Sequence, residues 1–170
     1  MLIRDATEDD LPGIFEIYDR EVLHGTATFD TVPKTHAERL EWLRVHQAPQ
    51  YPALVAVEPD HGGTRVLGWA SLSPWSVRCA YARAVENSVY VHPSAQGRGL
   101  GRALMQAIIP RAKAAGLGVL IARIVEGNPA SLALHEKLGF KTIGTMRRVG
   151  EKFGRILDVR LMDLHLDAGG

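Results

Sequence analysis

Apolar residues recur every three or four positions in four parts of the chain, and this spacing predicts four helices. The expected helices cover residues 11–22, 35–45, 99–115 and 128–140. The third has the clearest pattern, because its apolar positions lie four apart on one slowly drifting stripe. Pro110 falls inside that helix, where proline removes a backbone donor, so the sequence predicts a kink or a break there.

Alternating or continuous apolar runs predict seven strands. They cover residues 2–7, 51–58, 65–73, 84–93, 119–126, 141–152 and 156–166. Two further segments, 24–34 and 74–83, have no period, and we expect irregular loops there. Because there is no internal repeat and no linker, the pattern favours one mixed α/β domain over residues 1–170.

Composition places the chain among ordinary globular proteins and argues against several functional classes. Its 170 residues are 46% hydrophobic and 23% charged, with a net charge of +1. Lys and Arg are spread along the chain, whereas a nucleic-acid binder usually carries a basic block or stripe. No apolar run approaches the length of about 20 residues that crosses a bilayer. We therefore expect a cytoplasmic protein that binds neither nucleic acid nor membrane.

Cysteine and histidine spacing gives no sign of a disulfide or a metal site. Cys79 is the only cysteine, which excludes an internal disulfide and a cysteine-based zinc site. Five histidines show no H-x-x-x-H or H-E-x-x-H spacing. They are His24, His36, His46, His61 and His92. We expect no metal, and we interpret His165 in the last strand as structural.

A glycine-rich stretch, QGRGLG at 96–101, lies between the expected strand 84–93 and the expected helix 99–115. The first turn of a helix carries unpaired N–H groups and the positive end of the helix dipole, and glycines let a phosphate approach them. Arg98 and Arg102 add positive charge. The stretch lacks the Lys-Ser/Thr pair of a P-loop, and it follows the fourth expected strand, whereas a dinucleotide fold would place it near the first. A pyrophosphate group is the expected ligand, and a turn without a ligand is the alternative.

Two motifs resemble those of the GCN5-related N-acetyltransferase (GNAT) family. QGRGLG resembles the family's Q/R-x-x-G-x-G/A motif, and GNPASLALHEKLGF at 127–140 resembles its second signature, N-x-x-S-x-x-L-Y/H-x-x-L-G-F. The matching positions are Gln96, Gly99, Gly101, Asn128, Ser131, Leu134, His135, Leu138, Gly139 and Phe140. Segments 26–29, 74–81, 85–91 and 149–158 are similar to the phosphinothricin/methionine sulfone acetyltransferase branch of the family.

The resemblance implies a GNAT-type fold, in which a mixed, mostly antiparallel central sheet has a splayed strand pair and is flanked by about four helices. It also implies acetyl-CoA as the cosubstrate and a homodimer. The pyrophosphate would lie on the N–H groups of residues 97–102, and residues 89–91 would pair their backbone with the pantetheine amides, as an added strand does. The residues expected to bind acetyl-CoA are Val89, Tyr90, Val91, Gln96, Gly97, Arg98, Gly99, Leu100, Gly101, Arg102, Asn128 and Ser131.

The resemblance also suggests the catalytic groups. Free amines are mostly protonated near neutral pH, so acyl transfer to an amine needs a base. Glu86 stands where the branch carries its proposed general base. His135 stands where many members carry a tyrosine that protonates the departing thiolate, and it is either that acid or a buried helix histidine. The backbone N–H of Val89 or Tyr90 would polarise the thioester carbonyl.

The acceptor implied by this branch is a small amino-acid-like amine of the phosphinothricin, methionine sulfone or methionine sulfoximine type. Arg78 matches a phosphinothricin-type W-x-x-R spacing and would hold a carboxylate. The chain departs from methionine sulfone members at Ser76, where they carry Arg, and at Asn87, where they commonly carry His. The residues expected to form the acceptor pocket are Phe29, Trp75, Ser76, Val77, Arg78, Tyr81, Glu86, Asn87 and Ser88.

Two other functions remain open at this point. One is a protein or peptide N-terminal acetyltransferase, and the other is a non-catalytic sensor that only binds acetyl-CoA. The bulky loop at 74–81 argues for a closed small pocket and against the open groove that a peptide needs. Glu86 argues against a sensor, because binding alone needs no base.

Overall fold

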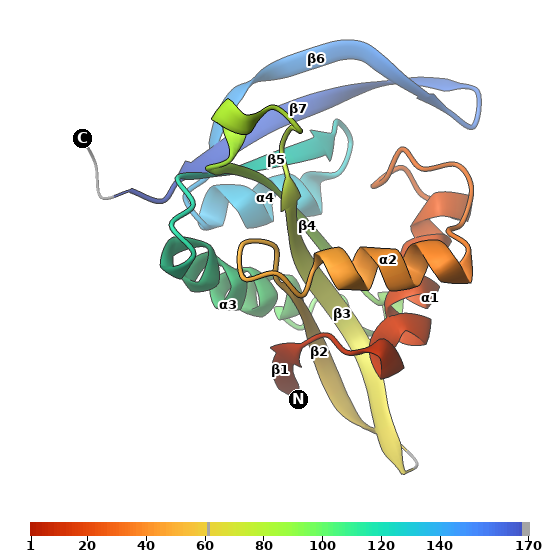
Figure 1. Ribbon diagram of the computed structural model, residues 1–170. Helices are drawn as coiled ribbons and strands as arrows, with labels where there is room; N and C mark the ends of the chain where they lie inside the picture. The colour runs from red at the N-terminus through yellow and green to blue at the C-terminus, as the bar shows by residue number, and fades with distance from the viewer. Residues whose placement is uncertain (61, 168–170) are drawn as a thin grey trace.

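The computed structural model describes residues 1–60 and 62–167, and a sheet of seven strands forms its centre (Figure 1). The strands are β1 (Leu2–Asp5), β2 (Ala53–Asp60), β3 (Gly63–Pro74), β4 (Ala84–Val91), β5 (Val119–Val125), β6 (Lys141–Lys152) and β7 (Arg155–His165). Their order is β1-β2-β3-β4-β5-β7-β6, and each neighbouring pair is antiparallel except β4 with β5. The predicted strands and the mixed, mostly antiparallel sheet are confirmed.

The described residues form four α-helices, as the helical spacing predicts. They are α1 (Leu11–His24), α2 (His36–Val45), α3 (Leu100–Ala114) and α4 (Pro129–Lys137). α1 and α2 lie on one side of the sheet, and α3 and α4 lie on the other (Figure 1). His61, which falls between the expected strands 51–58 and 65–73, lies outside the described residues.

The larger apolar cluster lies between the sheet and α3. Leu104 and Ile108 of α3 are fully buried against Leu72 of β3, Leu120 of β5 and Met162 of β7. The predicted stripe of α3 therefore faces the sheet, and its burial supplies a large share of the free energy of folding.

A second apolar cluster lies on the opposite side of the sheet and is rich in aromatic rings. Ile14 and Phe15 of α1 and Leu43 of α2 pack against Val55 of β2 and Trp69 of β3. This cluster holds α1 and α2 against the sheet, and it becomes the base of the site described below.

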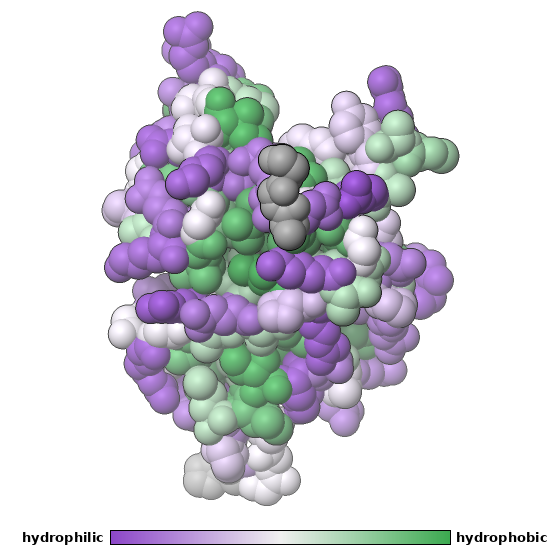
Figure 2. All heavy atoms as spheres, turned by 90° about the vertical axis from the view of Figure 1, so that its left-hand side faces the viewer, coloured by the Kyte–Doolittle hydropathy of each residue, from purple (hydrophilic) through white to green (hydrophobic). Residues whose placement is uncertain are grey.

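The outer surface of α3 is polar, with Arg102, Gln106, Arg111 and Lys113 exposed. Figure 2 views the molecule from the side that carries α3 in Figure 1, and hydrophilic residues there are mixed with separate apolar areas. Within the described part of the chain, no helix is long and apolar enough to cross a membrane.

The sequence predicts a kink or a break at Pro110. The break is wrong, since α3 runs as one helix through this residue. Pro110 and the residue four positions before it, Gln106, both lie on the exposed side of α3. Water can therefore bind the Gln106 carbonyl that proline leaves without a donor, while Ile108 and Ala112 stay packed in the core.

β4 and β5 pair only over their first three residues, where Ala84–Glu86 lie opposite Val119–Ile121. β4 continues to pair with β3 as far as Val91, and β5 pairs with β7 along its whole length. The sheet therefore opens between β4 and β5, and Glu86 is the residue at which the two strands part.

Candidate active site

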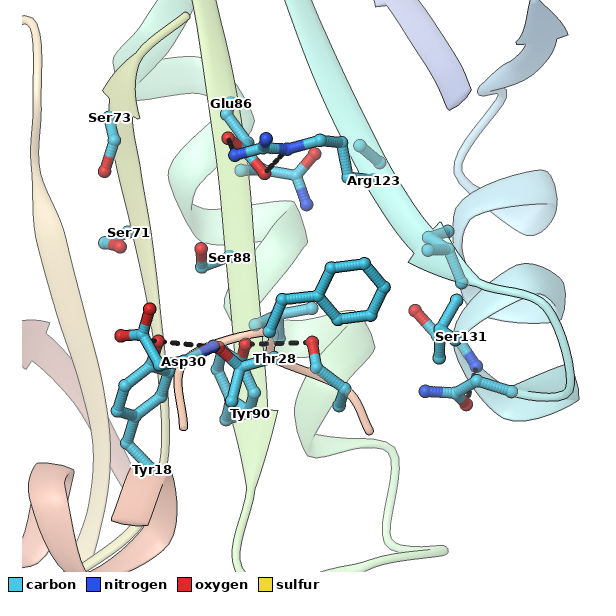
Figure 3. A pocket seen from close by; sticks show the side chains of 18 of the residues that line it. Tyr18, Thr28, Asp30, Ser71, Ser73, Glu86, Ser88, Tyr90, Arg123 and Ser131 are labelled. Carbon is cyan, nitrogen blue, oxygen red and sulfur yellow. Dashed lines mark hydrogen bonds and ion pairs between the residues drawn. The ribbon is translucent and has the colours of Figure 1, made fainter. Parts of the chain in front are cut away.

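A cavity of about 560 Å³ occupies the opening between β4 and β5 (Figure 3). Tyr18 and Trp69 bound it on the side of α1, whereas Asn128, Ser131 and His135 bound it on the side of α4. The cavity thus passes through the sheet, so two ligands can approach the same point from opposite faces.

Three pairs of residues on β3 and β4 form the wall on the α1 side. From the base to the top, the opposite residues are Trp69 and Tyr90, then Ser71 and Ser88, then Ser73 and Glu86. The Trp69 and Tyr90 rings stack with centroids 4.8 Å apart. The wall therefore changes from aromatic, through small and hydroxylated, to the Glu86 carboxylate, and Figure 3 shows Ser71 and Ser88 between Tyr90 and Glu86.

Glu86 forms a two-point ion pair with Arg123 of β5. Arg123 donates from Nε and Nη2 to the two carboxylate oxygens of Glu86, at 2.7 and 2.5 Å. The Glu86 side chain is 20% exposed and that of Arg123 is 52% exposed. These hydrogen bonds raise the pKa of Arg123. The Arg123 guanidinium also lies 5.7 Å from the centre of the Trp75 ring.

Arg123 was not predicted as a site residue, although the sequence contains a signal. It is the one charged residue within the apolar run VLIARIV that forms β5. A cation in a strand that is otherwise apolar needs a partner or water, so this position indicates a charged partner on a neighbouring strand.

His135 is only 2% exposed, and both of its ring nitrogens have partners. Because a carbonyl can only accept, Nδ1 donates to the Ser131 carbonyl at 2.8 Å, and Nε2 then accepts from the Asn87 amide at 2.9 Å. Burial lowers the pKa of His135 and favours its neutral form. Nε2 therefore carries no proton for a departing thiolate, so the geometry favours a buried helix histidine over an acid.

The glycine turn lies directly before α3. Gly97 and Gly99 have φ angles of 74° and 78°, a left-handed conformation that favours glycine, and a Cβ on either would meet nothing within 4 Å. The turn is exposed together with Arg98 and Arg102. Space, N–H groups at the helix start and positive charge therefore coincide there, which fits the pyrophosphate of acetyl-CoA.

Gly101 has a different role from the two glycines before it. A Cβ at this position would lie 3.2 Å from Leu134 Cδ2 of α4 and close to Val89 and Val91 of β4. The absent side chain lets α3, α4 and the end of β4 come together. The two sequence motifs, far apart in the chain, therefore meet beside the opening in the sheet.

The predicted acetyl-CoA residues lie along one path. Val89, Tyr90, Asn128 and Ser131 line the cavity, and the segment from Gln96 to Arg102 covers the glycine turn and the first residues of α3. The Asn128 side chain accepts a hydrogen bond from the Ser131 N–H at 3.1 Å and so caps α4. Asn128 therefore has a structural role at the start of α4 in addition to its predicted role in binding acetyl-CoA.

The predicted acceptor residues divide into two groups. Phe29, Glu86, Asn87 and Ser88 line the cavity, and Trp75 reaches its edge through Arg123. The remaining four do not line it. They are Ser76, Val77, Arg78 and Tyr81, and of these Val77 is 99% exposed. Within one chain, the loop after β3 therefore contributes less to the cavity than the sequence suggests.

The loop between α1 and α2 forms the wall opposite β4. Tyr18 donates to the Asp30 carboxylate at 2.8 Å and lies 2.8 Å from the Thr28 hydroxyl, and Lys34 lies 3.3 Å from Asp30. Burial raises the pKa of Tyr18. The sequence predicted Phe29 of this loop as a site residue but not Tyr18, Thr28, Asp30 or Lys34. Helical spacing explains Tyr18 as a core residue, and the loop has no periodic pattern.

The long hairpin of β6 and β7 holds that loop in place. Lys152 of β6 is buried and donates to the backbone carbonyls of Glu21 and Thr28, both at 2.9 Å. A Cβ on Gly150 would overlap the Phe29 ring, so the hairpin and the loop are in close contact.

Within residues 1–60 and 62–167, no group of three or more His, Cys, Asp or Glu side chains is placed to hold a metal ion. Of the histidines with no metal-binding spacing, His61 lies outside the described residues, and His46 is buried with both ring nitrogens hydrogen-bonded.

Comparison with known proteins gives a consistent result. Residues 7–140 match the model of the Acetyltransferase (GNAT) family. The chain is 46% identical over 165 residues to the L-methionine sulfoximine/L-methionine sulfone acetyltransferase of Pseudomonas aeruginosa, covering 97% of this chain and 94% of that protein. It is 40% identical over 157 residues to the phosphinothricin N-acetyltransferase of Streptomyces coelicolor, covering 92% and 91%.

The fold is also similar to solved structures. The structure of yncA from Salmonella typhimurium with its cofactor acetyl-CoA superimposes with a TM-score of 0.92 at 40% identity, covering 100% of this chain and 96% of that one. Because the superposition covers the whole of this chain, it includes the segments that line the cavity.

Proposed function

The chain belongs to the GNAT family of acetyltransferases, and on that premise we propose that it moves the acetyl group of acetyl-CoA to the amine of a small amino-acid-like acceptor. The observation that carries this proposal is the position of Glu86. It lies where β4 and β5 part, and it lines a cavity that both ligands can enter. Relatives named for methionine sulfone and phosphinothricin give the acceptor class.

The donor half of the site would hold acetyl-CoA through backbone groups. The turn from Gln96 to Arg102 would bind the pyrophosphate, and Val89 to Val91, which have no strand partner on the β5 side, would pair with the amide-bearing arm. When bound, acetyl-CoA supplies the activated acyl group. One N–H of Val89 or Tyr90 would then polarise the carbonyl that is attacked.

The acceptor half of the site would use Glu86 as the general base. An amine attacks only in its neutral form, so the carboxylate takes a proton from the acceptor nitrogen. The nitrogen then forms a bond to the thioester carbon as the carbon–sulfur bond breaks, and CoA leaves as a thiolate that takes its proton from water or from the protonated Glu86. The two oxygens of Glu86 have further acceptor capacity beyond the two hydrogen bonds from Arg123. Neutral His135 would fix the Asn87 amide beside the base and would not itself supply a proton.

The size and enclosure of the cavity favour a small acceptor over a peptide. The cavity of about 560 Å³ would also take the acetyl end of the donor, so the space left for the acceptor suits a small molecule, and residues of α1, the loop to α2 and the β6–β7 hairpin line it. A sensor that only binds acetyl-CoA would not need the Glu86 carboxylate, so catalysis is the better reading.

We also propose that the protein acts in the cytoplasm as a homodimer. Large apolar side chains are exposed on the β6–β7 hairpin and on the loop after β3, where an interface would bury them. They are Val77, Tyr81, Ile143, Val149, Phe153 and Ile156. Contact at this place would bring Arg78 and its neighbours close to a cavity that they do not line in one chain.

The function is tested by an acetyl-CoA turnover assay with a panel of acceptors. We expect turnover with methionine sulfone, methionine sulfoximine or phosphinothricin, and little with short peptides. Turnover with the peptides alone would assign the protein to the N-terminal acetyltransferases, and turnover with neither class would favour a sensor.

A further inference from the structure

Arg123 is placed to do more than support Glu86. Three basic residues are among the described residues that line the cavity, and they are Lys34, Arg123 and His135. Because burial lowers the pKa of His135 and favours its neutral form, Lys34 and Arg123 are the cations of this set. Lys34 is paired with Asp30 on the opposite wall, on the α1–α2 loop. Arg123 is therefore the only one of these cations beside the proposed base. Its side chain is 52% exposed and lines the cavity in which an acceptor would bind.

The Glu86–Arg123 pair matches the charges of a free amino acid. An α-amino acid carries an ammonium and a carboxylate on one carbon, and the pair presents a carboxylate and a guanidinium side by side. The amine would lie against Glu86, and the carboxylate would lie against Arg123. The flat guanidinium fork forms two parallel hydrogen bonds with a carboxylate, as it already does with Glu86.

We propose that Arg123 binds the α-carboxylate of the acceptor, exchanging part of its contact with Glu86 for the incoming carboxylate, and so makes the enzyme selective for free amino-acid-like amines. This inference rests on the proposed function. It replaces Arg78, the arginine that the sequence suggested for this role, with one that lines the cavity.

Two further observations support the exchange. The Arg123 side chain is 52% exposed, so an incoming carboxylate can reach its guanidinium, and the exchange replaces hydrogen bonds to one carboxylate by hydrogen bonds to another. The Trp75 ring lies within 5.7 Å of the guanidinium, which keeps the cation near the cavity when one of its hydrogen bonds changes partner.

The test compares an acceptor with its α-carboxamide, which keeps the amine and the side chain but removes the negative charge. The best acceptor of the panel is used, and kcat/KM is measured for both forms. Arg123→Gln should lower the preference for the acid over the carboxamide by about tenfold or more, as expected for lost hydrogen bonds to a charged group.

Arg160→Gln is the matched control. Arg160 of β7 also forms a two-point pair with a carboxylate, that of Glu126, at 2.9 and 3.1 Å, but neither residue lines the cavity. This variant should keep the acid preference of the parent protein. Binding of acetyl-CoA to both variants, measured by calorimetry, verifies that the donor half of the site is intact.

An unchanged acid preference in Arg123→Gln would overturn the proposal. Equal losses of kcat for the acid and the carboxamide would also overturn it, because they would restrict Arg123 to positioning Glu86. Failure of the parent protein to acetylate any amino-acid analogue would contradict the proposed function, which the same assay detects before the variants are compared.

Discussion

Two buried histidines share one hydrogen-bonding arrangement. His46 and His135 each donate from Nδ1 to the carbonyl four residues earlier, that of Trp42 at 2.7 Å and that of Ser131 at 2.8 Å. Nε2 then accepts, from the Ser73 hydroxyl in one case and from the Asn87 amide in the other. Burial lowers the pKa of both from the ordinary value of 6.5, so the folded protein holds them neutral.

This arrangement predicts that the protein loses stability as the pH falls from about 7 to about 5, because the unfolded chain binds protons that His46 and His135 refuse in the folded state. The free energy of unfolding should fall by at most about 1.4 kcal/mol per pH unit for each histidine. Urea unfolding at several pH values measures this slope. It should be shallower in His135→Gln, and an equal slope in the variant and the parent would contradict the assignment.

Single residues were predictable where their chemistry is local, and not where it depends on a partner. Glu86 could be proposed because it stands where the resembling branch carries its proposed base, and the structure places it on the cavity. Its partner Arg123 is 37 residues away in the chain, and only the register of β4 with β5 brings the two together. The sequence offered two roles for His135, and the choice between them needed the direction of its hydrogen bonds with Ser131 and Asn87.

Helix α3 provides the clearest link between an element and function, because a left-handed glycine lies at each end. Gly99 precedes the helix with φ 78°, and Gly116 follows it with φ 76°. A Cβ would meet nothing within 4 Å at either position. The two positions therefore share a backbone conformation in which any other residue would be strained. Only Gly99 lies at the proposed pyrophosphate site.

Alanine at these two positions separates strain from ligand binding. Both Gly99→Ala and Gly116→Ala should lower thermal stability, since alanine in this conformation costs about 1 kcal/mol or more. Only Gly99→Ala should also weaken acetyl-CoA binding, by about tenfold, which corresponds to about 1.4 kcal/mol. Equal acetyl-CoA affinities in the two variants would mean that the glycines serve the turn alone.

At the level of elements, the periodicity of apolar residues predicted the helices and strands well. It failed at short features, such as the 3-10 turns at Cys79–Tyr81 and Pro93–Ala95, because three residues are too few to show a period. The break expected at Pro110 does not occur, because this residue lies on the exposed side of α3, away from the apolar stripe, and the helix continues through it. The strand expected over residues 84–93 ends at Val91, because a proline marks the end of a strand only approximately.

At the level of the whole molecule, the site exists because the sheet opens at one point. Residues from α1, α4 and strands β3 to β7, with the loop between α1 and α2, meet around that opening. Local patterns do not contain this information. β4 and β5 pair over three residues and then separate, and this separation is a property of the assembled sheet. The resemblance to a family predicted the splayed strand pair, and the structure shows which side chains line the opening between the two strands.

The same architecture gives the central claim a direct test. Donor and acceptor would meet at Glu86 from opposite faces of the sheet, and Glu86 would remove the proton as the acetyl group moves. Glu86→Gln keeps the size of the side chain and removes the base. Because Glu86 is partly exposed and its pair with Arg123 lies at the cavity, the variant should fold and bind acetyl-CoA as the parent does.

The deciding measurement is kcat for acetyl transfer in Glu86→Gln, with the Kd for acetyl-CoA determined on the same protein. We expect kcat to fall by about 100-fold or more, as is typical for the loss of a general base, while Kd is unchanged. An unchanged kcat at neutral pH would contradict the account, because the chemistry would then not depend on the residue at which β4 and β5 part.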